Sequence, residues 1–194
     1  FECDNDAAGN AVAPYSQGTW SNVSIFGPKA DAGTTINAQY ARALHLRRNT
    51  QTRVFNSVFA GYPTGLYIDG NSTQANATNG DLMFRNNVIA GMGTSLNVPS
   101  GQNWDQAAIT SWFNTSGWNN TVYANNSELQ VAAPFNLTAP NFLPNAGSPL
   151  LSGADFTWSP LTDSFFTPVT YRGAFGSTDW TAGWANWNPQ TTNY

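Results

Sequence analysis

A short stretch of sequence occurs twice, thirty residues apart, and this repetition limits the folds that the chain can adopt. Phe55–Gly70 is FNSVFAGYPTGLYIDG, and Phe84–Val98 is FRNNVIAGMGTSLNV. A looser copy lies upstream, where SNVSIFG (Ser21–Gly27) is followed by ALHL (Ala43–Leu46). Periods of 20 to 50 residues are typical of solenoids, propellers and arrays.

Each unit contains two short segments rich in β-branched and aromatic residues, bounded by Gly, Asn, Pro and Asp. Apolar and polar residues alternate in the second segment of each unit. We therefore predict an all-β fold, a right-handed parallel β-helix (solenoid). One shared core should contain Val23, Ile25, Val58, Leu66, Ile68, Val88, Leu96 and Val98. A β-sandwich with two fortuitously similar hairpins is the alternative.

Two further features follow from the repeat. Stacked coils would align Asn22, Asn56 and Asn86 as a ladder at one turn, where amides can donate to and accept from their neighbours. Between the two full units, residues 71–81 (NSTQANATNGD) are polar, and we predict a protruding loop there.

The sequence changes in character after residue 100. Apolar spacing preceded by Asp105 predicts one short helix, Asp105–Phe113. We expect one continuous structural domain with coils in 1–100, irregular final coils in 101–152 and an aromatic C-terminal cap in 153–194. In that cap we expect Phe165, Phe166, Phe175 and Trp180 to be mostly buried. The N-terminal coil should have an open edge, covered by the rest of a precursor or by another chain.

Composition excludes some functions. Charged residues make up only 9% of the chain, the net charge is −4, and no basic stripe is present, so nucleic acid is not an expected partner. No apolar run approaches the roughly 18 residues of a membrane span. Cys3 is the only cysteine, which excludes an internal disulfide. Uncharged polar chains of this kind are typical of secreted or cell-surface β-proteins.

Several motifs together resemble a known family. They are ECDND followed by SNVSIFGP, the FNSVFAGYPTGLYIDG unit, and the ending AGSPLLSGADF…DSFFTPVTYRGAFGSTDWTAGW. The chain resembles the C-terminal portion of secreted, mostly uncharacterised pectate-lyase-like β-helix proteins of Bacteroidota. The resemblance covers nearly the whole chain and implies the fold and export by type IX secretion. It implies no settled activity.

Two candidate sites emerge from the residues. His45, Tyr67 and Asp69 alternate with inward leucines and Ile68, so they should project from stacked strands, with Asp81 on the same side. They could bind a glycan, or they could be a solvated surface with turn-stabilising aspartates. Glu2, Asp4 and Asp6 would share one face of an extended strand and could hold Ca²⁺, unless they form a solvated acidic turn.

Two classes of function remain open at this point. One is a non-catalytic surface module for adhesion, glycan binding or extracellular assembly, in which Trp180, Trp184 and Trp187 either bind sugar or pack on the last coil. The other is a fragment of a polysaccharide lyase or glycoside hydrolase. No compact catalytic set is evident in the sequence, and fold alone does not fix function.

Overall fold

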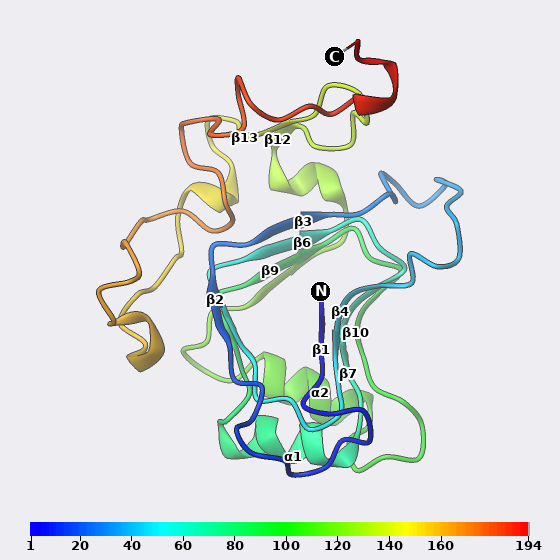
Figure 1. Ribbon diagram of the computed structural model, residues 1–194, viewed down its shortest axis with the longest axis vertical. Coiled ribbons are helices and arrows are strands. Elements are labelled where there is room, and N and C mark those ends of the chain that lie inside the picture. Colours follow the sequence, from blue (N-terminus) through cyan, green and yellow to red (C-terminus); the bar gives the residue numbers. More distant parts are fainter. Residues whose placement is uncertain (194) are drawn as a thin grey trace.

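Three parallel sheets form the body of the molecule. The structure, a computed structural model, describes residues 1–193. Sheet A contains β1 (Glu2–Cys3), β4 (Arg42–Leu46), β7 (Thr64–Ile68) and β10 (Thr94–Asn97). Sheet B contains β2 (Thr19–Ser21), β5 (Arg53–Phe55) and β8 (Met83–Arg85), and sheet C contains β3 (Ser24–Phe26), β6 (Val58–Ala60), β9 (Val88–Ala90) and β11 (Thr121–Tyr123). In Figure 1 sheet C lies across the top of the body, with sheet B on the left and sheet A on the right.

The strand register follows the sequence repeat. Val58 pairs with Val88 and Leu66 with Leu96, in each case thirty residues apart. The looser upstream copy enters the same sheets, since Ser24 pairs with Val58. Every pairing among β1–β11 is parallel, which does not fit the sandwich of hairpins considered as the alternative.

The turn between sheets B and C is made by asparagine in three successive coils. Asn22, Asn56 and Asn86 have φ of 56°, 51° and 59°, a left-handed conformation that asparagine tolerates. Their predicted alignment at one turn is confirmed, but the predicted mutual hydrogen bonds are wrong. Because the left-handed backbone directs these side chains outward, they bond instead to the C-terminal part of the chain, as when Asn86 Nδ2 donates to Gly153 O at 3.1 Å.

The hydrogen-bonded ladder lies one residue further along. Asn87 Oδ1 accepts from Ser57 N at 2.9 Å, and Asn120 Oδ1 accepts from Asn87 N at 3.0 Å. Asn87 Nδ2 donates to Val54 O at 2.9 Å. These inward side chains satisfy backbone groups that the turn removes from the sheets.

Apolar residues pack on both sides of sheet C rather than in the one shared core predicted from the repeat. Phe59 and Ile89 face the interior with Leu66, Ile68 and Leu96. The prediction for Val58 and Val88 is wrong in its direction, because these valines flank the inward residues of short strands and face outward. There they form a second cluster with Ala60, Ala90, Leu129 and Leu150. Val23, Ile25 and Val98 are half-buried.

Two helices fill the side between the lower ends of sheets A and B (Figure 1). The predicted loop at 71–81 is wrong, since α1 (Asn71–Asn79) forms there. Its buried side chains are mostly polar, so it has no apolar period, and hydrogen bonds hold it in place: Asn76 Nδ2 donates to Asn49 O at 3.1 Å. The predicted helix at 105–113 is confirmed as α2 (Gln106–Phe113), with Asp105 accepting from Ala108 N.

A line of phenyl rings runs through the interior. The ring centroid of Phe59 lies 6.5 Å from that of Phe1 and 6.1 Å from that of Phe84. The centroid of Phe84 in turn lies 6.0 Å from that of Phe113 of α2. Helix α2 therefore closes the interior of the last coil. At the other end, the outer edges of β1, β2 and β3 pair with no strand among residues 1–193, as the prediction of an open edge requires.

The rest of the chain does not cap the last coil as predicted. After η1 (Asn126–Leu129), β12 (Val131–Ala133) and β13 (Asn141–Pro144) form an antiparallel pair. Residues 145–193, here called the C-terminal arm, contain η2 (Pro149–Leu151), η3 (Ser159–Leu161) and η4 (Pro189–Thr191). The arm passes beside sheets B and C (Figure 1), bonding to the outward asparagines of several coils.

Burial in the arm differs from the prediction accordingly. Phe175 is buried and Phe166 half-buried, but Phe165 is 83% exposed and Trp180 is 51% exposed. The coil end that these rings were expected to cover is already filled by α2. Residues 180–184 form turns, so the tryptophans do not share a helical face.

Candidate functional site

The outer face of sheet A carries a row of polar side chains in register. Glu2 pairs with His45, His45 with Tyr67, and Tyr67 with Asn97, one residue from each of four strands. The His45 and Tyr67 rings lie 5.2 Å apart between centroids. Since the neighbouring leucines face inward, the alternation predicted from the sequence places this row on the surface.

Asp69 joins the row at the end of β7. Its Oδ2 lies 3.2 Å from His45 Nε2, and its Oδ1 accepts from Gln102 Nε2 at 2.8 Å. A carboxylate can only accept, so a neutral His45 carries its proton on Nε2 and directs the Nδ1 lone pair toward Glu2, whose Oε1 is 4.0 Å away. The structure therefore brings together His45, Tyr67 and Asp69, as predicted.

Burial and nearby charges set the protonation of this pair. Burial lowers the pKa of His45, the Asp69 hydrogen bond offsets this only in part, and Arg42 and Arg47 lower it further. Burial alone would raise the pKa of Asp69, but hydrogen bonds from Gln102 and His45 outweigh it, so that pKa lies below its usual value. The pair is thus a neutral imidazole oriented by a carboxylate at neutral pH.

Arginines balance the acids at the N-terminal edge of the row. Arg47 Nε lies 3.1 Å from Asp4 Oδ1 and 3.4 Å from Glu2 Oε1, and Arg48 Nη1 donates to Asp4 Oδ2 at 2.8 Å. These contacts place opposite charges side by side. The charges of these acidic and basic side chains therefore largely cancel at this edge of the row.

The faces of the Tyr67 ring are partly occupied. The guanidinium carbon of Arg42 lies 4.4 Å from the ring centroid, and His45 tilts against the ring at 58°. Arg42 is exposed, so its side chain can be displaced by a ligand. Sugar stacking on Tyr67 would require that displacement.

Asp81 lies apart from the other predicted ligand-binding residues. It follows α1 and precedes β8, where its carbonyl accepts from Arg53 Nε of sheet B at 3.3 Å. His45 and Asp69 lie on sheet A, at the other end of α1. The helix that replaces the predicted loop separates them.

The predicted calcium ligands do not form a cluster. Glu2 and Asp4 face arginines, and the chain leaves β1 after Cys3, so the three acids do not share one strand face. Asp6 instead accepts from Asn10 N at 2.6 Å and from Asn10 Nδ2 at 3.0 Å. Within residues 1–193, no group of three or more His, Cys, Asp or Glu side chains is placed to hold a metal ion. The geometry gives the calcium hypothesis no support.

Comparison with known proteins places the chain in a family. The family model described as the pectate-lyase-like beta helix domain matches residues 1–185. The chain belongs to this family. No curated protein and no solved structure matches it. In addition, no helix in residues 1–193 is long and apolar enough to cross a membrane.

This pectate-lyase-like β-helix protein has a polar groove beside the row. The groove has a volume of about 320 Å³, and its lining includes Arg47, Arg48, Asp69, Gly70 and Ser72. It lies where sheet A meets the start of α1. A ligand on the row would extend into this groove, where charged and backbone groups are available for hydrogen bonds.

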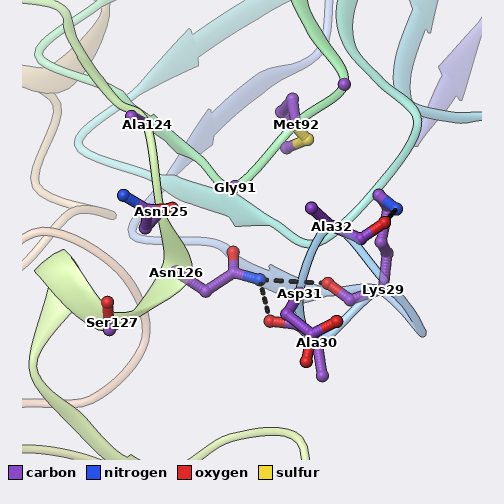
Figure 2. A pocket seen from close by; sticks show the side chains of 11 residues that line it. Lys29, Ala30, Asp31, Ala32, Gly91, Met92, Ala124, Asn125, Asn126 and Ser127 are labelled. Carbon is purple, nitrogen blue, oxygen red and sulfur yellow. Dashed lines mark hydrogen bonds between the residues drawn. The ribbon is translucent and has the colours of Figure 1, made fainter. Parts of the chain in front are cut away.

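A second surface pocket of the β-helix protein, of about 370 Å³, lies where the turn after β9 meets residues 29–32. Figure 2 shows Asn126 pointing across it, with Nδ2 donating to Lys29 O at 3.0 Å and to Ala30 O at 2.7 Å. Gly91 has φ of 61°, and a Cβ there would collide with the Asn126 carboxamide. Asn126, which lines this pocket, therefore holds the 29–32 segment beside the turn after β9.

Sequence reasoning missed Asn97 of the row and two residues that contact the row. Gln102 bonds to Asp69 from 33 positions away, outside any repeat unit, so no local pattern marks it. Arg42 begins β4, and strand alternation would place it on the face opposite to His45, so no pattern in the sequence indicates its contact with Tyr67.

Proposed function

We propose that this β-helix protein is a secreted or cell-surface module that binds a glycan without cleaving it. The ligand would lie along the outer face of sheet A. The observation that carries the proposal is the in-register row of Glu2, His45, Tyr67 and Asn97, which places one polar or aromatic side chain on each successive strand. A polymer lying across the strands would meet one of these side chains about every 4.8 Å.

The binding chemistry follows from the row's neighbours. Arg42 and Arg47 would meet carboxylate or hydroxyl groups of the glycan, and Asn97 would bond to hydroxyls. Tyr67 would stack with a sugar ring once Arg42 moves, at about 1 kcal/mol per contact, by analogy with aromatic pairs. Affinity would therefore depend on several sugar units or several molecules binding at once.

Location and assembly belong to the same proposal. The low charged fraction and the motif resemblance support export, by type IX secretion in a member of the Bacteroidota. We infer that the sheets wind into a right-handed solenoid, because connections between parallel strands are right-handed in nearly all proteins. The open edges of β1, β2 and β3 would be covered by another chain or by further coils.

A second candidate function is supported by the His45–Asp69 pair. The carboxylate orients the imidazole and leaves Nδ1 free, which is the arrangement of a general base. With Arg47 nearby to bind a uronate carboxylate, this pair could support a polysaccharide lyase. The same side chains would bind the polysaccharide in either case, so only the release of products distinguishes a lyase from a binding module.

One experiment separates the two functions. The protein is tested against a panel of acidic and neutral polysaccharides, with and without Ca²⁺, for binding and for release of unsaturated or reducing ends. We expect binding without product, weakened by Tyr67→Ala and unchanged by Asp81→Asn. Product release abolished by His45→Ala would establish the lyase, and binding that Tyr67→Ala leaves unchanged would contradict the site.

A further inference from the structure

A second surface of the molecule is lined by aromatic rings. Two neighbouring cavities, of about 340 and 280 Å³, share Phe26, Phe142 and Trp187 in their linings. We call them together the aromatic groove. It lies between β3, β13 and the C-terminal turns, and it reaches Tyr40 and Tyr62, which precede strands β4 and β7.

The groove has a rigid aromatic wall. Phe142 stacks on Phe26 with 5.5 Å between ring centroids, and its centroid lies 5.3 Å from that of Phe175. Phe175 stacks in turn on Trp180, with 5.3 Å between centroids. Trp187 packs edge-on against Phe142 at 5.4 Å and remains 43% exposed. Because Trp187 lines both cavities, a ligand spanning the groove must contact it.

Polar groups without partners lie among these rings. The hydroxyls of Tyr40 and Tyr62 and the indole N–H of Trp187 make no hydrogen bond within residues 1–193. Tyr62 is half-buried, and burial raises the pKa of its hydroxyl, which therefore stays protonated as a donor. An apolar peptide or acyl chain in the groove would leave these groups unpaired, at a cost in affinity.

The aromatic groove also differs from the row on sheet A in its lack of charged side chains. Neither cavity is lined by Asp, Glu, Lys or Arg. At the row, by contrast, Glu2 and Asp4 both contact Arg47. An ionic ligand would gain nothing in the groove, whereas a polyhydroxylated neutral ligand matches both its rings and its free donors.

We propose that the aromatic groove is a second glycan-binding site, specific for an uncharged polysaccharide. A sugar ring packs on Trp187, and ring hydroxyls bond to Tyr40 and Tyr62. This site is separate from the row on sheet A and does not depend on it. Together the two sites would let one molecule bind two different polymers.

The test measures affinity of the full chain for soluble neutral polysaccharides, namely xyloglucan, galactomannan and hydroxyethylcellulose, with polygalacturonate as the charged comparison. We expect at least one neutral polymer to bind. Trp187→Ala should weaken that binding about tenfold, a loss of 1.4 kcal/mol. Tyr40→Phe, which keeps the ring and removes the hydroxyl, should weaken it about threefold.

Trp20→Ala is the matched control, because Trp20 of β2 is 46% exposed, much like Trp187, and lines neither cavity. It should leave the affinity unchanged, and so should Tyr67→Ala on sheet A. Tyr40 is 53% exposed, so Tyr40→Phe decides the matter if Trp187→Ala does not fold. Failure of every neutral polymer to bind, or equal losses in Trp20→Ala and Trp187→Ala, would overturn the proposal.

Discussion

The coils and the C-terminal arm are ordered in different ways. In the strands of residues 53–98 each paired residue lies next to the residue thirty positions further along, as Leu66 does with Leu96. The arm has no repeat and no strand of its own, and its regular structure consists of three short 3₁₀ helices. The coils are thus stabilised by contacts that recur from one coil to the next, whereas the arm is stabilised by individual contacts with the coils.

Those contacts are mostly hydrogen bonds at the outward turns of the coils. Asn22 Nδ2 donates to Tyr171 O at 2.8 Å, and Gly173 N donates to Asn56 O at 2.7 Å. Gly173 approaches the coils so closely that a Cβ would lie 2.8 Å from Val58 Cγ1. Damage to the coils should therefore unfold the molecule, while damage to an arm contact should release only the arm.

The largest effect is expected from Phe84→Ala in the coils. Phe84 is fully buried between Phe59 and Phe113, so its loss leaves a cavity that neighbouring coils cannot fill. We expect the free energy of unfolding to fall by about 3–5 kcal/mol. Chemical denaturation measures this value. Phe165→Ala in the arm, where the ring is 83% exposed, should change it by less than about 0.5 kcal/mol; equal losses would refute the comparison.

The next effect concerns the internal amide ladder. Asn87→Ala removes the acceptor for the buried Ser57 N–H and the donor to Val54 O. Leaving these backbone groups unpaired should cost about 2–3 kcal/mol, again by denaturation. Asn114→Ala, at an exposed helix end, serves as the control. A loss no larger than that control's would mean that water replaces the amide.

A smaller and more local effect is expected at the arm. Asn86→Gly keeps the left-handed turn but removes the bonds to Gly153 O and from Trp158 Nε1. Global stability should fall by less than about 1 kcal/mol, while proteolytic cleavage within the arm speeds up several-fold. Asn119→Gly is matched, since Asn119 also has positive φ but bonds only to Gly117. Equal cleavage rates for the two variants would show that the arm is held elsewhere.

The same comparison explains what the sequence could predict. Where the repeat governs structure, prediction succeeded: the thirty-residue register, the aligned asparagines and the projecting His45 and Tyr67 all follow from spacing. It failed for the direction of Val58, because a strand of three residues has too short an alternation to show which side is the interior. It failed for α1, because a helix buried through polar side chains has no apolar period.

The arm could not be predicted by such reasoning. Its aromatic residues suggested burial, but burial depends on which surface the arm meets, and α2 had already closed the coil end. Likewise Gln102, which orients Asp69, comes from a segment outside the repeat. Contacts between distant, unrepeated segments leave no pattern in a single sequence.

The smallest effect expected is a pH dependence that belongs to the coils alone, since His45 is the only histidine. The pKa of His45 is lower in the folded chain than its usual 6.5, so protonation favours the unfolded chain. Stability should therefore be full above about pH 7 and fall as the pH drops through 6.5 toward the folded value. The lowered pKa of Asp69 stabilises the fold above its unfolded value of 3.8, and this contribution is lost only at more acidic pH. Denaturation at pH 7.5 and 5.5 should show a decrease in the wild type that is smaller in His45→Gln, where the N-terminal ammonium of Phe1, whose pKa burial also lowers, still titrates. An equal decrease in that variant would assign the pH dependence to other groups. It would mean that the hydrogen bond to Asp69 cancels the effect of burial on the pKa of His45.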